Sequence, residues 1–193
     1  MENLILSILA ESLAVKDRSV KENLDKLNTG AQRLAECLAS ERKVLIFGNG
    51  GSAADAQHIA AEFVNRFAIE RPPLAAIALT TDTSILTSIG NDYRFDDIFS
   101  KQIHALGKKG DVAWAISTSG NSSNVLQGIE AAGEKEMATI AMTGRGGRLA
   151  AKADLSLTVM SDSTARIQET HLIMAHILCE LVERILFPKH FKK

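Results

Sequence analysis

Cysteine is scarce in this sequence, so a disulfide framework is not expected. The 193 residues include two cysteines, Cys37 and Cys179, which lie far apart and each fall inside an apolar helical pattern. Small disulfide-stabilised folds instead have many cysteines and fold in an oxidising compartment. We therefore expect two buried thiols and a reducing, cytoplasmic location.

Excess basic charge is absent as well, and so is a long apolar segment at the N-terminus. The formal net charge is -1 at pH 7, which argues against a nucleic-acid partner bound through a basic surface. Glu2 and Glu11 interrupt the first apolar stretch, and no basic region precedes it. We therefore expect neither a signal peptide nor a membrane span.

Two common nucleotide-binding motifs are also missing. The apolar run of residues 44–47 leads into GNGGS, which does not have the spacing of the dinucleotide fingerprint G-x-G-x-x-G. The Lys-Ser or Lys-Thr pair of a P-loop does not follow either. A nicotinamide or nucleoside triphosphate site is therefore disfavoured.

The sequence does show an alternation of helical and strand-like segments. Its 46% hydrophobic and 23% charged residues predict one globular domain over residues 1–193. Helices are predicted over about residues 1–40, with a break near residues 17–19, and over residues 163–187. Between them, the α/β core of residues 43–160 has apolar runs at residues 44–47, 74–79, 111–117, 137–143 and 155–160. This pattern predicts a doubly wound, five-stranded parallel sheet with helices on both faces.

The terminal helices each have a heptad-like apolar stripe. The stripes consist of Val20, Leu24, Leu27, Ala31, Leu34 and Leu38, and of Ile167, His171, Met174, Leu178, Leu181 and Ile185. Packing within one subunit is one explanation, but together the stripes offer more apolar surface than one sheet covers. We favour a homo-oligomer assembled through them, which charged residues at Leu178 and Leu181 would dissociate.

Residues 43–66 form the first candidate binding segment. A buried strand leads into Gly48, Asn49, Gly50 and Gly51, and Ser52 with Asp55 resembles a capping box that opens a helix over residues 53–66. In an α/β fold such a loop delivers backbone amides to an anion or sugar phosphate, although it is equally common as a simple tight turn.

Residues 117–123, STSGNSS, form the second candidate, with six hydrogen-bonding side chains and no charge. Hydroxyls and amides at a helix start can surround a phosphate, and a plain polar loop with a helix cap explains fewer of these side chains. The pair Asn91-Asp92 is predicted to lie in a loop, where it either makes a turn or contacts sugar hydroxyls.

His58 and Glu62 are one helical turn apart and therefore share a helix face. Gln168 and His176 on the last helix complete a possible N/O ligand set for zinc. An isolated helical histidine is more often structural, and His171 is assigned to packing for that reason.

The motifs GNGGSAADAQH, ALTTDTS, SIGNDY, ISTSGNSSNV and ARIQETH, in this order and spacing, resemble the bacterial phosphoheptose isomerases of the sugar isomerase (SIS) superfamily. The resemblance covers the chain after about residue 20. It implies a flavodoxin-like SIS fold and conversion of sedoheptulose 7-phosphate to D-glycero-D-manno-heptose 7-phosphate. This reaction is the first step towards the heptose of lipopolysaccharide and related glycans. The resemblance also implies a cytoplasmic homotetramer with one zinc ion per subunit. Arg94 departs from the glycine common in the family.

The resemblance also implies site residues. Substrate contacts match Asn49, Gly50, Gly51, Ser52, Glu62, Asn91, Asp92, Ser117, Thr118, Ser119, Ser122 and Gln168, and zinc ligands match His58, Glu62, Gln168 and His176. Glu62 matches the catalytic base and His176 the acid. A non-catalytic relative that binds the replication initiator lacks this glutamate. A binding module, either of that kind or a sugar-phosphate sensor, is therefore the alternative, and Glu62 favours the enzyme.

Overall fold

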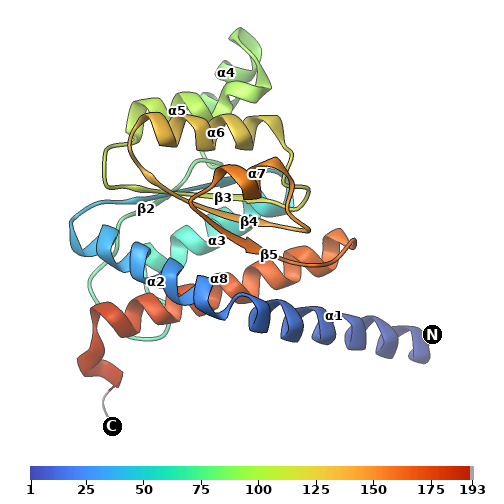
Figure 1. Cartoon of the computed structure of the whole chain (residues 1–193). Coiled ribbons are helices and arrows are strands. Elements are labelled where there is room, and N and C mark those ends of the chain that lie inside the picture. The colour runs from blue at the N-terminus through green and yellow to red at the C-terminus, as the bar shows by residue number, and fades with distance from the viewer. Residues whose placement is uncertain (192–193) are drawn as a thin grey trace.

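The computed structural model describes residues 1–191, which alternate between helix and strand (Figure 1). The elements are α1 (Glu2–Glu22), α2 (Leu24–Ala39), β1 (Val44–Gly48), α3 (Gly51–Val64), β2 (Ala76–Ala78), α4 (Thr83–Asp92), η1 (Phe95–Asp97), α5 (Ile98–Leu106), β3 (Val112–Ser117), α6 (Ser123–Glu134), β4 (Ala138–Thr143), α7 (Gly147–Lys152), β5 (Leu155–Thr158), α8 (Thr164–Leu186) and η2 (Pro188–Phe191).

The five strands form one parallel sheet in the order β2-β1-β3-β4-β5. This is the flavodoxin-like order of a doubly wound sheet, with the chain reversing direction between β1 and β3. Every residue of β1 and β3 is buried, as expected for strands covered on both faces. The predicted fold class is therefore confirmed.

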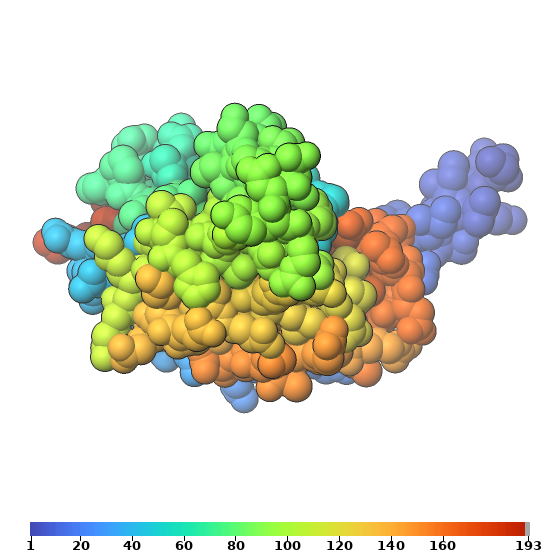
Figure 2. Space-filling view, turned by 90° about the horizontal axis from the view of Figure 1, so that it is seen from above, coloured from blue at the N-terminus to red at the C-terminus, as the bar shows by residue number. Residues whose placement is uncertain are grey.

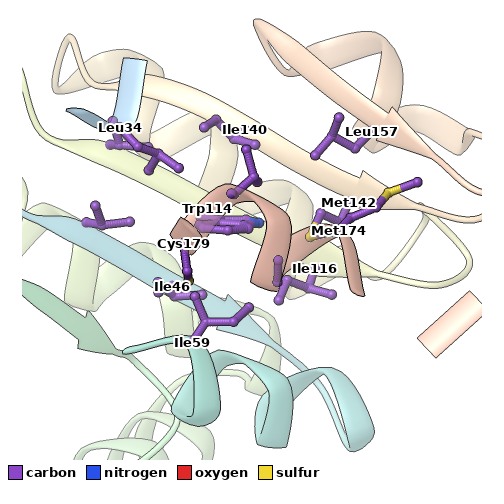
Figure 3. Close-up of a cluster of buried hydrophobic side chains, with 14 of the residues drawn as sticks. Leu34, Ile46, Ile59, Trp114, Ile116, Ile140, Met142, Leu157, Met174 and Cys179 are labelled. Carbon is purple, nitrogen blue, oxygen red and sulfur yellow. The ribbon is translucent and has the colours of Figure 1, made fainter. Parts of the chain in front are cut away.

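Alternate residues of the central strands face two separate cores because side chains along a strand alternate between the faces of a sheet. On one face Ile46 and Trp114 pack with residues of α2, α3 and α8, among them Met174 (Figure 3). On the other face Phe47 packs with Phe99 of α5 and other residues of α5, α6 and α7. The carboxyl ends of the strands remain at one edge, where the candidate loops begin.

The predicted helix break near residues 17–19 is wrong by several residues, since α1 and α2 meet at Asn23. The buried Asn23 side chain donates to the carbonyl oxygens of Ser19 and Thr158, at 2.8 and 3.0 Å. It also accepts from the backbone N–H of Thr158. The break therefore lies where an asparagine connects the helices to the end of β5.

The two apolar stripes pack mostly within the subunit, which corrects their assignment to an oligomer interface. Leu34, Met174 and Leu178 are all 0% exposed, because α2 and α8 pack against each other and on the sheet. Exposed apolar side chains are instead concentrated on α1, which extends beyond the body of the molecule (Figure 2). They are Leu4, Ile5, Leu6, Ile8, Leu9 and Leu13.

The remaining expectations concern the C-terminal end, the cysteines and the membrane. The last helix, predicted over residues 163–187, ends at Leu186, and Pro188–Phe191 form a 3₁₀ helix. Lys192 and Lys193 lie outside the described residues. Cys37 and Cys179 are buried free thiols, as predicted. Among the described helices, none combines the length and the apolar character that crossing a bilayer requires.

Candidate active site

The first loop, residues 48–52, connects β1 to α3. A Cβ at Gly48 would lie 2.6 Å from the carbonyl oxygen of Ile116, so only glycine permits this approach of β1 and β3. Gly50 has a φ of 55° and is the N-cap of α3, which has no side-chain cap hydrogen bond. The predicted Ser52–Asp55 capping box is therefore wrong: Ser52 is buried inside the first turn, and a glycine turn begins the helix.

The second loop, residues 117–123 and hereafter the serine loop, connects β3 to α6. The hydroxyl oxygens of Ser117 and Ser122 are 3.1 Å apart, and Ser122 is the N-cap of α6. The Ser119 hydroxyl accepts from the backbone N–H of Asn121, within a turn that requires the positive φ of Gly120. Hydroxyls therefore converge at the amino end of α6, where the helix dipole favours an anion.

A pair of amides connects the two loops. The Asn49 Nδ2 donates to Oδ1 of Asn124 at 2.8 Å, and the Asn124 Nδ2 donates to Oδ1 of Asn49 at 2.9 Å. Asn124 is 3% exposed, so its amide fixes the orientation of Asn49 from beneath. The sequence did not single out Asn124, although it lies one residue beyond the STSGNSS segment.

The proposed metal ligands His58, Glu62 and His176 lie together. The Nε2 atom of His58 is 3.0 Å from Nε2 of His176 and 3.1 Å from Oε1 of Glu62, and the ligand atoms all lie within 4.8 Å of one another. Tetrahedral zinc with bonds near 2.0–2.1 Å separates its ligand atoms by about 3.3 Å. The donor types and their spacing thus fit a zinc ion.

The surroundings of the His58–Glu62–His176 cluster favour the neutral form of His176. Burial and the nearby His58 lower the pKa of His176, and Glu62 partly opposes them. The ring of Phe67 packs 5.3 Å from the His176 ring and covers one side of it. A neutral imidazole retains the lone pair that a metal or a proton requires.

Gln168 occupies a different position from the other three ligand candidates. Its side chain contacts the first loop, because a Cβ at Gly51 would overlap its amide nitrogen. Gln168 also precedes His176 by eight residues, or about 12 Å of helical rise. Its carboxamide therefore lies at the start of α3, whereas His58 and Glu62 lie two and three turns further along that helix.

Asn91 and Asp92 are not in a loop, which corrects the sequence prediction. They are the last two residues of α4, both exposed, and the Asn91 Nδ2 donates to Oδ1 of Asp92 at 2.8 Å. No residue of α4 is buried, and the helix protrudes from the body (Figure 1). A cavity of about 160 Å³ lies between the base of this protrusion and the first loop, lined by Asn49, Gly50, Leu86 and Phe95 among others.

A buried ion pair lies next to the His58–Glu62–His176 cluster and connects the two helices that bear it. The Arg71 Nε donates to Oε1 of Glu183 at 2.9 Å, and both side chains are 1% exposed. Arg71 also donates to the carbonyl oxygens of Glu62 and Phe63. The pair therefore connects the end of α3, which bears Glu62, to α8, which bears His176. The sequence did not single out either residue.

Comparisons with known proteins show the family of this chain. The SIS domain family model matches residues 9–144. A phosphoheptose isomerase of Nitratidesulfovibrio vulgaris is 52% identical over 185 residues, covering 95% of this chain and 89% of the relative. The chain belongs to the phosphoheptose isomerase family.

Two solved phosphoheptose isomerases share the whole fold. The structure from Neisseria gonorrhoeae has a TM-score of 0.89 at 46% identity and covers 94% of this chain and 98% of the other. The structure from Francisella tularensis has a TM-score of 0.90 at 40% identity, with 94% and 97% covered. Membership of the phosphoheptose isomerase family makes the chain an isomerase, and the non-catalytic binding module is not favoured.

Proposed function

We propose that this chain converts sedoheptulose 7-phosphate to D-glycero-D-manno-heptose 7-phosphate, the first step towards activated heptose for lipopolysaccharide or related glycans. The observation that supports this most directly is the placement of Glu62. Its carboxylate lies 3.1 Å from the His58 imidazole and within 4.8 Å of the His176 imidazole of α8, and Glu62 is on α3, the helix that begins at the first loop. A ketose–aldose isomerisation requires such a base, together with donors for the developing oxygen charge.

Glu62 acts as the base and His176 as the acid in this proposal. Glu62 removes a proton from the hydroxymethyl carbon next to the ketone, while His176 gives a proton to the carbonyl oxygen, which yields an enediol. Return of a proton to the former carbonyl carbon and loss of the terminal hydroxyl proton then give the aldose. Only protons move in this sequence, so no external oxidant or reductant is required.

One zinc ion per subunit is the proposed cofactor, held by His58, Glu62 and His176 of one subunit. Gln168, the fourth proposed ligand, contacts the start of α3 in its own subunit, so we assign it to the zinc site of a neighbouring subunit. When bound, zinc supplies a Lewis acid that polarises substrate oxygens. Glu62 is assigned two roles, as ligand and as base. The contact with His58 involves Oε1, so we assign metal binding to that oxygen and proton transfer to Oε2.

The two loops are proposed to bind the sugar phosphate. Ser117, Thr118, Ser119 and Ser122 receive the phosphate at the amino end of α6. Asn49, Gly50, Gly51, Ser52 and Gln168 contact the sugar chain, together with Glu62, and Asn91 with Asp92 contact its hydroxyls from the end of α4. The hydroxyl convergence at Ser117 and Ser122 supports the phosphate assignment.

A cytoplasmic homotetramer with sites beside the subunit interfaces is proposed as well. Exposed Leu6 and Leu9 on the protruding α1 need a partner to cover them. Gly51 and Glu62 are also eleven residues apart on α3, about 16 Å along its axis. This separation supports a site in which a neighbouring subunit completes the contacts. The buried free thiols support a reducing compartment.

The reaction is tested by NMR of purified protein with sedoheptulose 7-phosphate. The proposal predicts appearance of the aldoheptose phosphate, loss of turnover after chelation and recovery when zinc is restored. A folded, zinc-loaded protein that forms no aldoheptose phosphate would contradict it. Mixing Glu62→Gln subunits with subunits disabled in the serine loop tests the shared site, because shared sites recover activity on reassembly and separate sites do not.

A further inference from the structure

A third loop, residues 144–146, packs directly on the serine loop together with the first residues of α7. The backbone N–H of Gly144 donates to the carbonyl oxygen of Thr118 at 3.0 Å, and Arg148 N–H donates to Oδ1 of Asn121 at 3.1 Å. A Cβ at Gly120 would overlap the carbonyl of Gly146. The two loops thus form one rigid unit, and residues 144–148 stay at a fixed distance from the hydroxyls of the serine loop.

Arg145 extends from this third loop into a cavity that it shares with the serine loop. The cavity measures about 260 Å³ and is lined by Thr118, Ser119, Arg145, Ser161, Asp162, Thr164 and Ile167. Arg145 supplies the positive charge in this lining and Asp162 the negative charge. The hydroxyl-rich loop therefore has a guanidinium within the same hollow.

Asp162 holds this guanidinium in a two-pronged ion pair. The Arg145 Nε lies 2.5 Å from Oδ1 and Nη2 lies 2.7 Å from Oδ2 of Asp162. The two side chains are 53% and 81% exposed, and exposed ion pairs contribute little to stability because water competes for both charges. Asp162 therefore holds Arg145 only weakly, and a stronger anion can displace it.

We propose that Arg145 is an additional recognition residue for the substrate phosphate and that Asp162 is its competing anion. The inference rests on the proposed function and adds a residue to it. A phosphate monoester has about -1.5 to -2 charge at neutral pH, and an arginine fork binds it through two parallel hydrogen bonds. When phosphate enters the serine loop, Arg145 exchanges the Asp162 carboxylate for the phosphate. Asp162 thereby limits the affinity, which allows the product to leave.

The test uses variants that break the same ion pair from opposite ends. Arg145→Gln should raise KM for the sugar phosphate roughly three- to tenfold with little change in kcat, because a charge-assisted contact is lost. Asp162→Asn should lower KM about two- to fivefold, because the competitor is removed. Combining both substitutions should reproduce Arg145→Gln, since Asp162 acts only through Arg145. Arg148→Gln is the matched control: it removes an exposed charge three residues away, at the start of α7, and should leave KM unchanged.

If the ion pair is purely structural, both single variants should shift KM in the same direction, and not in opposite directions as proposed. That result, or no shift in either variant, would overturn the proposal. Titration with inorganic phosphate provides a readout that needs no turnover and should show the same order of affinities. If the wild type and the variants bind phosphate with this order of affinities but the wild type does not turn over the heptulose phosphate, the reaction assignment fails and the role of Arg145 stands.

Discussion

Replacing Glu183 with glutamine removes the charge from the ion pair behind the active site. In the wild type, Glu183 accepts from Arg71 and from the backbone N–H groups of Phe67 and Ala68, at 2.9 to 3.0 Å. The amide oxygen of glutamine can still accept some of these bonds, but the Arg71 guanidinium loses its counter-charge while 1% exposed. Breaking a buried pair from one side costs about 3–5 kcal/mol.

We expect the lower end of that range, about 3 kcal/mol, because Arg71 keeps its bonds to the carbonyl oxygens of Glu62 and Phe63. For a chain of this size the loss corresponds to a Tm about 6–12 °C lower. Calorimetry or thermal unfolding by circular dichroism measures it, at equal protomer concentration because assembly adds to stability.

Glu180→Gln is the matched control for this measurement. Glu180 lies on the same helix and pairs with Arg184 at 2.6 Å, but its side chain is 44% exposed. Such a pair contributes about 0.3–0.5 kcal/mol, so Tm should fall by no more than about 2 °C. Equal effects of Glu183→Gln and Glu180→Gln would refute the argument that burial makes the Arg71 pair costly to break.

The pH dependence provides a second check on Glu183. Burial opposes its ionisation, but the N–H groups of Phe67 and Ala68 and the Arg71 guanidinium outweigh burial and hold its pKa below 4.5. The stabilisation is therefore complete above the unfolded-state pKa and is lost as the pH falls through the lower folded-state pKa. Acid unfolding curves of the wild type should fall more steeply below about pH 5 than those of Glu183→Gln.

Three further predictions concern the site and the assembly. Ser119→Ala should raise KM about two- to tenfold with kcat nearly unchanged, since it removes one neutral hydrogen bond to the phosphate; a drop in kcat alone would assign the loop another role. His58→Ala should retain less than one zinc per subunit after gel filtration, whereas wild-type zinc content in the variant would remove His58 from the ligand set. Leu6→Lys with Leu9→Lys should yield folded, smaller species by light scattering, and Leu178→Lys should instead unfold the subunit, because Leu178 is 0% exposed.

Local sequence patterns predicted most of the fold because a strand that is buried on both faces appears in the sequence as a short continuous apolar run. Continuous apolar runs located all five strands, and the glycine- or hydroxyl-rich loops after three of these runs located the edge where the loops gather. The helix break and the role of the stripes could not be predicted in this way. Asn23 ends α1 through contacts with Thr158, 135 residues away. The apolar stripe of α8 is buried against the sheet and α2, and the apolar pattern of one helix does not show how much of its surface other elements cover.

The site was predicted only in part for a similar reason. Helical spacing places His58 and Glu62 on one face, but the approach of His176 depends on how α3 and α8 pack. The contacts of Asn124 and Arg145 are with residues distant in the sequence, Asn49 and Asp162. A polar residue in a loop has many possible partners, and tertiary packing selects one.

The turnover of Glu62→Gln tests the central claim most directly. The amide preserves the size of the side chain and removes the base, so kcat on sedoheptulose 7-phosphate should fall about a hundredfold to ten-thousandfold. The assay is NMR in D₂O, where wild-type product should contain solvent deuterium at the carbon that receives a proton. Unchanged unfolding, assembly and zinc content of the variant confirm that only the proton transfer is altered. A folded Glu62→Gln protein with near-wild-type kcat and the same deuterium content would show that the proton moves through another group.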